Sequence, residues 1–159
     1  MQARLPLIAM GLLAMAGCTP QPPDCSRVSN RRNLIQCLAW NQGRSDRDLL
    51  QACWPLSPSS RIEGIWVTSL ENSSFFERAT QLDRSMLTRL ATWLEVANPP
   101  AEVIRSQQGE ALRAYQISLV GRQTLCEAHY GHMGVFPHEV IVDRIVHLQP
   151  LDTHPLAGR

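Results

Sequence analysis

The clearest strand pattern in this chain of 159 residues is Glu139-Val-Ile-Val-Asp-Arg-Ile-Val-His-Leu148. Its apolar residues at positions 140, 142, 146 and 148 share one side of an extended chain, whereas Asp143 and His147 share the other. A period of two predicts a strand with one buried face. Residues 61–70 and 112–120 are rich in β-branched and aromatic residues, which suit strands. We therefore expect at least three strands.

Helical spacing is predicted at the N-terminal side of these strands. Between residues 30 and 41, apolar residues recur at helical intervals, and Gln42-Gly43 is a plausible stop. Ser45 then offers an N-cap, with Asp48 three residues on, before a second short helix that ends at Pro55. Two short helices joined by so short a connection predict a helical hairpin.

A third helix is predicted over residues 83–97, where one apolar stripe follows helical spacing and Asn98-Pro99-Pro100 ends it. The stripe consists of Met86, Leu87, Leu90, Ala91, Leu94 and Ala97. The fold class that follows is α+β: the N-terminal helical hairpin plus a small antiparallel sheet, or a partly open OB-like barrel with one packing helix. An OB-like barrel needs five strands. The missing two would come from the Phe75 region, from residues 105–108 or from the loop near Cys126.

The N-terminus has the pattern of an export signal, because a basic residue precedes an apolar run from Leu5 to Ala16. Met15-Ala16-Gly17-Cys18 resembles the lipobox of bacterial lipoproteins. This resemblance implies cleavage before Cys18 and acylation of that residue, which would anchor the protein in a membrane. Thr19, rather than Asp, follows the cysteine, and in Gram-negative lipoproteins this points to the outer membrane, with the domain facing the periplasm or the cell surface.

Four regions follow from this reading: a signal peptide (1–17), an acylated Pro-rich tether (18–24), one disulfide-stapled α+β domain (25–150) and a C-terminal tail (151–159). Without Arg4 of the signal, fourteen Arg balance fourteen Asp and Glu. Such a balance supplies no basic field for nucleic acid, so we expect no nucleic-acid partner. The chain has no lysine, which excludes Schiff-base catalysis and a phosphate-loop lysine.

Four cysteines follow Cys18, and an even number in an exported chain predicts two disulfides. The candidates are Cys25, Cys37, Cys53 and Cys126. Three of them lie close together, so at least one bridge is expected within that segment while Cys126 fastens it to the C-terminal half. The spacing leaves the three possible pairings open.

The segment from Leu125 to His138 is the expected binding surface, because it is long for a connection between strands. Candidate binding residues are Arg122, His129, Tyr130, His132 and His138. The three histidines could instead ligate zinc or copper, although their spacing matches no diagnostic metal motif. No cofactor and no catalytic residue is predicted. The four tryptophans at positions 40, 54, 66 and 93 are expected in the core, with Trp54 the best exception.

Residues 64–71, 115–122, 130–134 and 140–144 resemble small proteobacterial lipoproteins without an assigned activity. The expected function is a non-catalytic, outer-membrane-anchored accessory or binding lipoprotein whose partner is an envelope protein or peptidoglycan. Three alternatives are an inhibitor or immunity lipoprotein against a cell-wall hydrolase, an envelope metal-binding protein or enzyme using histidines 129–138, and a structural lipoprotein of a secretion or conjugation apparatus.

Overall fold

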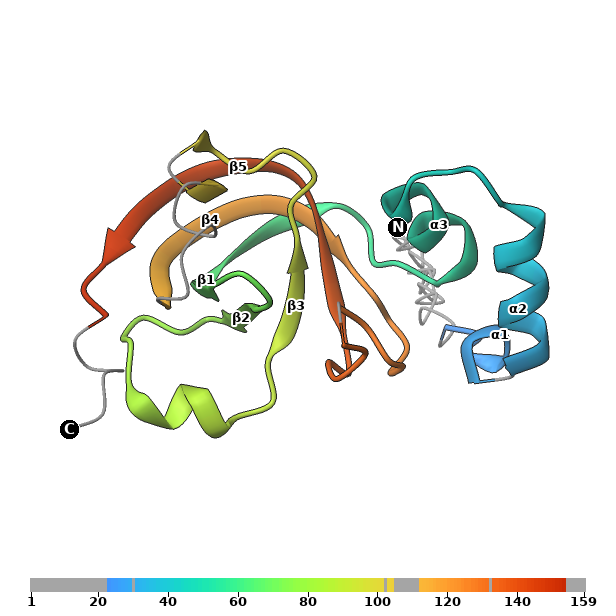
Figure 1. The fold of residues 1–159 in the computed structure, drawn as a ribbon, viewed down its shortest axis with the longest axis horizontal. Helices are drawn as coiled ribbons and strands as arrows, with labels where there is room; N and C mark the ends of the chain where they lie inside the picture. Colours follow the sequence, from blue (N-terminus) through green and yellow to red (C-terminus); the bar gives the residue numbers. More distant parts are fainter. Residues whose placement is uncertain (1–22, 30, 102, 105–111, 132, 154–159) are drawn as a thin grey trace, which may run out of the picture.

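The computed structural model describes residues 23–29, 31–101, 103–104, 112–131 and 133–153 (Figure 1). Within them the helices are α1 (Ser26–Ser29), α2 (Arg31–Trp40), α3 (Asp46–Cys53) and the 3₁₀ helix η1 (Arg84–Thr88). The strands are β1 (Ser60–Thr68), β2 (Ser73–Glu77), β3 (Thr92–Glu95), β4 (Arg113–Gln123) and β5 (Glu139–Leu151). Helices α1 to α3 lie together at one side of the strands (Figure 1).

The five strands form a closed barrel in the order β1-β2-β3-β5-β4. The β3–β5 pair is parallel and the other pairs are antiparallel. β4 and β5 are long and strongly curved (Figure 1), and their pairing shifts register between Ser118 and Leu119 and between Val120 and Gly121. Such irregularities bend a strand, which a small barrel requires. The arrangement is compatible with an OB-like barrel.

The barrel interior is the main core of the molecule. Its buried residues are Ile62, Trp66, Phe75, Leu94, Val103, Tyr115, Ile117, Leu119, Val140 and Val142. The indole Nε1 of Trp66 donates to Ser73 Oγ at 3.0 Å, and Ser73 Oγ donates to the Leu94 carbonyl at 2.6 Å. One buried polar chain thus connects β1, β2 and β3, so the indole is buried without losing its hydrogen bond.

Most of the predicted elements are present. β1, β4 and β5 cover the three predicted strands, and β2 comes from the Phe75 region. α2 and α3 occupy the predicted helical segments, and Ser45 caps α3 by accepting from the Asp48 amide at 3.3 Å. Residues 105–108, considered for a further strand, lie outside the described residues.

The predicted helix over 83–97 is wrong. The structure has the short helix η1, capped by Asp83, and then the strand β3. Leu94 of β3 is buried in the barrel interior, whereas Leu90, on the same predicted stripe, is 85% exposed. Burying Leu94 and closing the barrel between β2 and β5 outweigh the local helical pattern, which Thr88 and Thr92 already weaken.

The cysteines form two disulfides, Cys25–Cys126 and Cys37–Cys53, with Cα–Cα distances of 5.6 and 5.7 Å. The expectation that Cys126 fastens the N-terminal segment to the C-terminal half is confirmed. The Cys37–Cys53 bridge, which spacing left open, joins α2 to the last residue of α3. The helical segment is therefore covalently tied both to itself and to the segment that follows β4.

The predicted signal peptide, Cys18 and most of the tether lie outside the described residues. In the part of the chain that is described, no helix combines the length and the apolar character needed to cross a membrane. The predicted tail begins later than expected, because Leu151 still belongs to β5 and pairs with Ala114.

Candidate functional site

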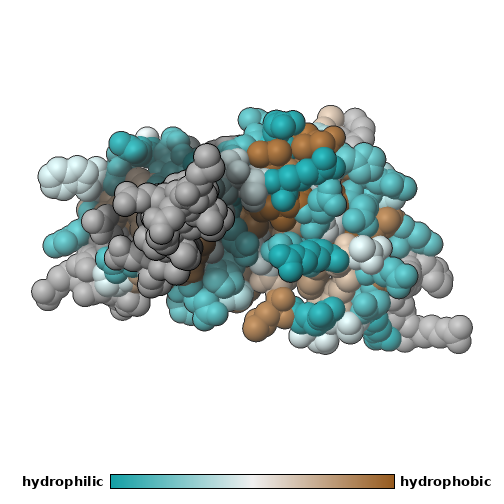
Figure 2. All heavy atoms as spheres, turned by 180° about the vertical axis from the view of Figure 1, so that it is seen from behind, coloured by the Kyte–Doolittle hydropathy of each residue, from teal (hydrophilic) through white to brown (hydrophobic). Residues whose placement is uncertain are grey.

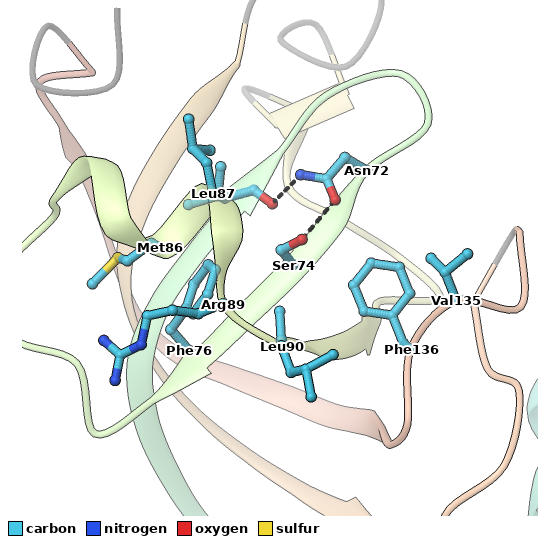
Figure 3. A pocket seen from close by; sticks show the side chains of 11 residues that line it. Asn72, Ser74, Phe76, Met86, Leu87, Arg89, Leu90, Val135 and Phe136 are labelled. Carbon is cyan, nitrogen blue, oxygen red and sulfur yellow. Dashed lines mark hydrogen bonds between the residues drawn. The ribbon is translucent and has the colours of Figure 1, made fainter.

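An apolar groove lies on the outside of the barrel, between η1 and the segment from Thr124 to His138 that joins β4 to β5 (Figure 3). We call this segment the β4–β5 loop. The groove has a volume of about 230 Å³. It is lined by Val67, Asn72, Ser74, Phe76, Met86, Leu87, Arg89, Leu90, Ala91, Val135 and Phe136. Residues more than 40 positions apart in sequence thus form its two walls.

The two walls carry exposed apolar side chains. Leu87 and Leu90 on the η1 side are 46% and 85% exposed, and Val135 on the loop side is 67% exposed. In Figure 3 Leu90 extends between Phe76 and Phe136, with Val135 further along the loop wall. Leu90, Val135 and the ring of Phe136 together form an apolar surface from which a partner protein could displace water.

The polar groups at the other end of the groove are engaged within the protein. Asn72 Nδ2 donates to the Val67 carbonyl at 3.4 Å, and Asn72 Oδ1 accepts from Ser74 Oγ at 2.6 Å (Figure 3). Among the described residues that line the groove only Arg89 is charged, and its guanidinium points away from Leu90 and Phe136 (Figure 3). The groove therefore offers mainly apolar contacts.

The loop wall is held in place by its own contacts. Tyr130 N donates to the Phe136 carbonyl at 3.0 Å, and Phe136 N donates back to the Tyr130 carbonyl at 3.4 Å. Between them, Gly131 takes a φ of 74°, which favours glycine. Phe136 then packs edge-on against Trp93 of β3, with ring centroids 5.2 Å apart. The disulfide of Cys126 fixes the beginning of the loop to the helical segment.

Tyr130 is buried beneath the loop and does not face a partner. It is 3% exposed, and its hydroxyl donates to the Cys126 carbonyl at 2.9 Å. Burial raises the pKa of Tyr130 to about 12, and the nearby Glu139 carboxylate adds to the rise, while a hydrogen bond with Thr124 opposes it. Its role in this structure is to support the loop from within.

The predicted histidines have separate contacts in the described residues. His129 Nδ1 lies 2.9 Å from the Gly134 carbonyl, and His138 Nε2 lies 3.9 Å from Glu127 Oε1. His132 falls outside the described residues. Among the residues that are described, no three His, Cys, Asp or Glu side chains are grouped so that they could hold a metal ion. The His129 contact links two positions of the loop.

Arg122 lies on β4, away from the loop tip. Its Nη2 forms a salt bridge with Asp143 Oδ1 on β5 at 2.9 Å, and Asp143 Oδ2 accepts from Ser59 Oγ at 2.9 Å. Both charged side chains are mostly covered, at 28% and 26% exposure. Arg122, predicted as a binding residue, therefore connects β4 to β5 in this structure.

A second hollow, of about 480 Å³, lies beside the first half of β1 and the end of β2. Its charged side chains pair with one another: Arg61 contacts Glu63 at 2.9 Å and Arg78 contacts Glu77 at 3.3 Å. All four side chains are at least 40% exposed, and ion pairs of this kind contribute little. The apolar groove is the better defined site.

Val135 and Phe136 lie within the predicted binding segment but were not among its candidate residues, and Leu87 and Leu90 were expected in a buried stripe. The available signal was Thr92-Trp-Leu-Glu95, whose β-favouring residues could have ended the helix earlier. With η1 short, Leu87 and Leu90 lose the helical partners that would have buried them. Seen from behind, the surface of the barrel is mostly hydrophilic, with hydrophobic atoms exposed near its upper edge and also lower down (Figure 2).

No protein-family model, no curated protein and no solved structure matches this chain.

Proposed function

We propose that this chain is a non-catalytic accessory lipoprotein, anchored in the outer membrane through Cys18, whose periplasmic domain binds a protein of the cell envelope. The observation that carries the binding part is the apolar groove between η1 and the β4–β5 loop. The anchoring part rests on the resemblance of residues 15–18 to a lipobox.

The chemistry of the groove favours a polypeptide partner over peptidoglycan. Glycans are bound through many hydrogen bonds, whereas Asn72 and Ser74 already bond to each other here. A volume of about 230 Å³ is also below the usual range of about 300–1,000 Å³ for small-molecule sites. A single large apolar side chain of a partner protein, inserted between Leu90 and Phe136, fits the arrangement better.

The test is capture from detergent-solubilised envelopes with the lipidated protein and three variants. Leu90→Asp and Val135→Asp place a charge on opposite walls of the groove. Leu70→Asp is the matched control, because Leu70 is 68% exposed and lies outside the groove lining. Loss of an interface anchor typically costs 2 kcal/mol or more, so each groove variant should bind the partner roughly 30-fold more weakly.

The expected result is one protein that is retained by the wild type and by Leu70→Asp and lost by both groove variants. Equal retention by all four proteins would refute the groove as the binding site. Mass spectrometry of the N-terminal peptide tests the anchor separately, because acylation at Cys18 adds the mass of fatty acyl groups. An unmodified thiol at Cys18 would refute the lipoprotein assignment, and the result of the binding experiment would still stand.

A further inference from the structure

A second apolar surface is exposed on α2, at the far side of the helical segment from the barrel (Figure 1). Trp40 is 91% exposed and Ile35 is 54% exposed, and Gln36 and Ala39 between them are exposed as well. At about 100° per residue these four positions span an arc of about 140°. Three of the four are apolar, and tryptophan is enriched at the interface between a lipid bilayer and water.

The orientation of this arc is fixed from the other side of the helix. Cys37 is bonded to Cys53 of α3, and Asn41 Nδ2, just beyond α2, donates to the Cys37 carbonyl at 2.8 Å. The side of α2 that carries Cys37 therefore faces α3, and Ile35 and Ala39 lie on the opposite side. Trp40, the last residue of α2, is 91% exposed, so the expectation that it is a core residue is wrong.

Charge is distributed unevenly along the chain. Residues 25–54 contain five Arg and two Asp, a net charge of +3, whereas residues 55–159 contain nine Arg and eleven Asp or Glu, a net charge of −2. A positive segment beside a negative domain is attracted to a surface of anionic lipid headgroups. A chain whose overall net charge is only +1 can thus present a preferred side to a membrane.

The chain length between the predicted lipid and the first helix limits how far this side can move from the bilayer. Seven residues lead from Cys18 to Cys25, and they span at most about 25 Å when fully extended. α1 begins at Ser26, and Cys25 is tied to Cys126. The helical segment, which begins at α1, and the start of the β4–β5 loop at Cys126 are therefore the described parts that a lipid at Cys18 would hold nearest to the membrane.

We propose that the exposed arc of α2, from Ile35 to Trp40, lies on the surface of an anionic lipid bilayer and orients the domain there. This inference rests on the proposed anchor at Cys18. η1, which forms one wall of the groove, lies at the opposite end of the barrel from α2 (Figure 1). With α2 against the lipid, the η1 wall of the groove lies at the end of the domain that is farther from the bilayer.

The test uses the full-length lipidated protein reconstituted into phosphatidylethanolamine and phosphatidylglycerol vesicles with brominated acyl chains, which quench tryptophan fluorescence near the bilayer. Because one of the four tryptophans reaches the lipid, about a quarter of the emission should be quenched. Trp40→Phe should abolish this quenching. Trp93→Phe is the matched control and should leave it intact, since Trp93 packs against Phe136 in the loop wall.

Replacing phosphatidylglycerol with phosphatidylcholine should reduce the quenching, because the attraction to the basic segment is removed. Protein that floats with the vesicles but shows equal emission with and without bromine would overturn the inference and leave the anchor standing. Protein that does not float would refute the anchor. Cys18 is then coupled through its thiol to a maleimide lipid, so that quenching of Trp40 is still measured and either supports or overturns the proposed contact.

Discussion

Tyr130 is the residue through which the β4–β5 loop is fixed to the rest of the molecule. It packs with Leu50 of α3 and Ile141 of β5, and its ring lies 6.1 Å from that of Trp54. Its hydroxyl bonds the loop back onto itself at Cys126, whose sulfur is bonded to Cys25. One buried side chain thus contacts the helices, the barrel and the loop.

We predict that Tyr130 makes stability depend on pH at the alkaline end. The pKa is raised from 10.0 to about 12 in the folded protein, chiefly because burial disfavours the charged phenolate. The contribution of the neutral form is fully present below about pH 10 and is lost as the pH rises towards 12. Urea unfolding at pH 7 and pH 11 should show a decline for the wild type that is smaller in Tyr130→Phe. The variant should also lose about 1 kcal/mol at pH 7, because the hydrogen bond to Cys126 is removed.

The chain suits this measurement because it has no lysine and only two tyrosines. The difference between wild type and Tyr130→Phe therefore isolates one group from Tyr115. An identical decline in both proteins would show that Tyr130 ionises at the same pH in the folded and the unfolded chain, contrary to its buried position.

Comparing alanine variants of Gly131 and Gly43 separates two costs of adding a side chain: the strain of a positive φ and the lack of space beside the β4–β5 loop. Both have a positive φ, of 74° and 87°. A Cβ on Gly131 would lie 2.7 Å from the Trp93 ring, whereas one on Gly43 would meet nothing within 4 Å. Each alanine variant should lose about 1–2 kcal/mol from the strained backbone. Gly131→Ala should lose about 1–3 kcal/mol more through overpacking, as measured by thermal or urea unfolding. Equal losses would mean that Trp93 moves aside freely.

Among the elements, β3 is the one whose local sequence pattern predicts a helix while the structure has a strand. The burial of Leu90 and Leu94 distinguishes the two. A helix over 83–97 would bury Leu90 and Leu94 on one stripe, but the structure buries Leu94 at 2% exposure and leaves Leu90 at 85%. Leu94→Ala should therefore cost about 2–5 kcal/mol in urea unfolding, because it opens a cavity in the barrel. Leu90→Ala should change stability by less than about 0.5 kcal/mol. Comparable losses would favour the helix instead.

The same element shows how far the sequence allowed the fold to be predicted. β5 carries an alternation of apolar and polar residues, β1 and β4 are rich in β-branched and aromatic residues, and α3 carries its own cap at Ser45, so local patterns were sufficient for these elements. β3 has four residues, and its strand state depends on pairing with β2 and β5 from distant parts of the chain. No local pattern contains that information.

Of the two walls of the candidate site, the sequence predicted only the β4–β5 loop, because the other wall also depends on how distant segments pack. The β4–β5 loop stood out by its length, and Val135 and Phe136 lie within it. The other wall required knowing that η1 is short and that Leu87 and Leu90 are exposed. A groove between η1 and the β4–β5 loop, which are far apart in sequence, forms only when the barrel has brought them together.

In the whole molecule, the helical segment and the barrel are connected in two ways. A hydrophobic cluster of Leu50, Tyr130 and Ile141 packs α3 against β5 and the loop, and the Cys25–Cys126 disulfide crosses the same boundary. The Cys37–Cys53 disulfide lies entirely on the helical side. The two bridges should therefore differ in what they stabilise.

Removing each bridge by paired serine substitutions tests this difference. Cys25 and Cys126 are separated by 101 residues and Cys37 and Cys53 by 16. Because a longer closed loop restricts the unfolded chain more, the losses in stability should be about 4.7 and about 3 kcal/mol.

Without Cys25–Cys126 we also expect helix circular dichroism to fall at lower urea than the fluorescence of the buried Trp66, since the cluster alone must then hold α3 on the barrel. The Cys37→Ser/Cys53→Ser protein is the control for losing a bridge that does not cross the boundary, and its helix and barrel transitions should shift to lower urea together. Coincident helix and barrel transitions without Cys25–Cys126 would show that the hydrophobic cluster is sufficient to make the two parts unfold as one.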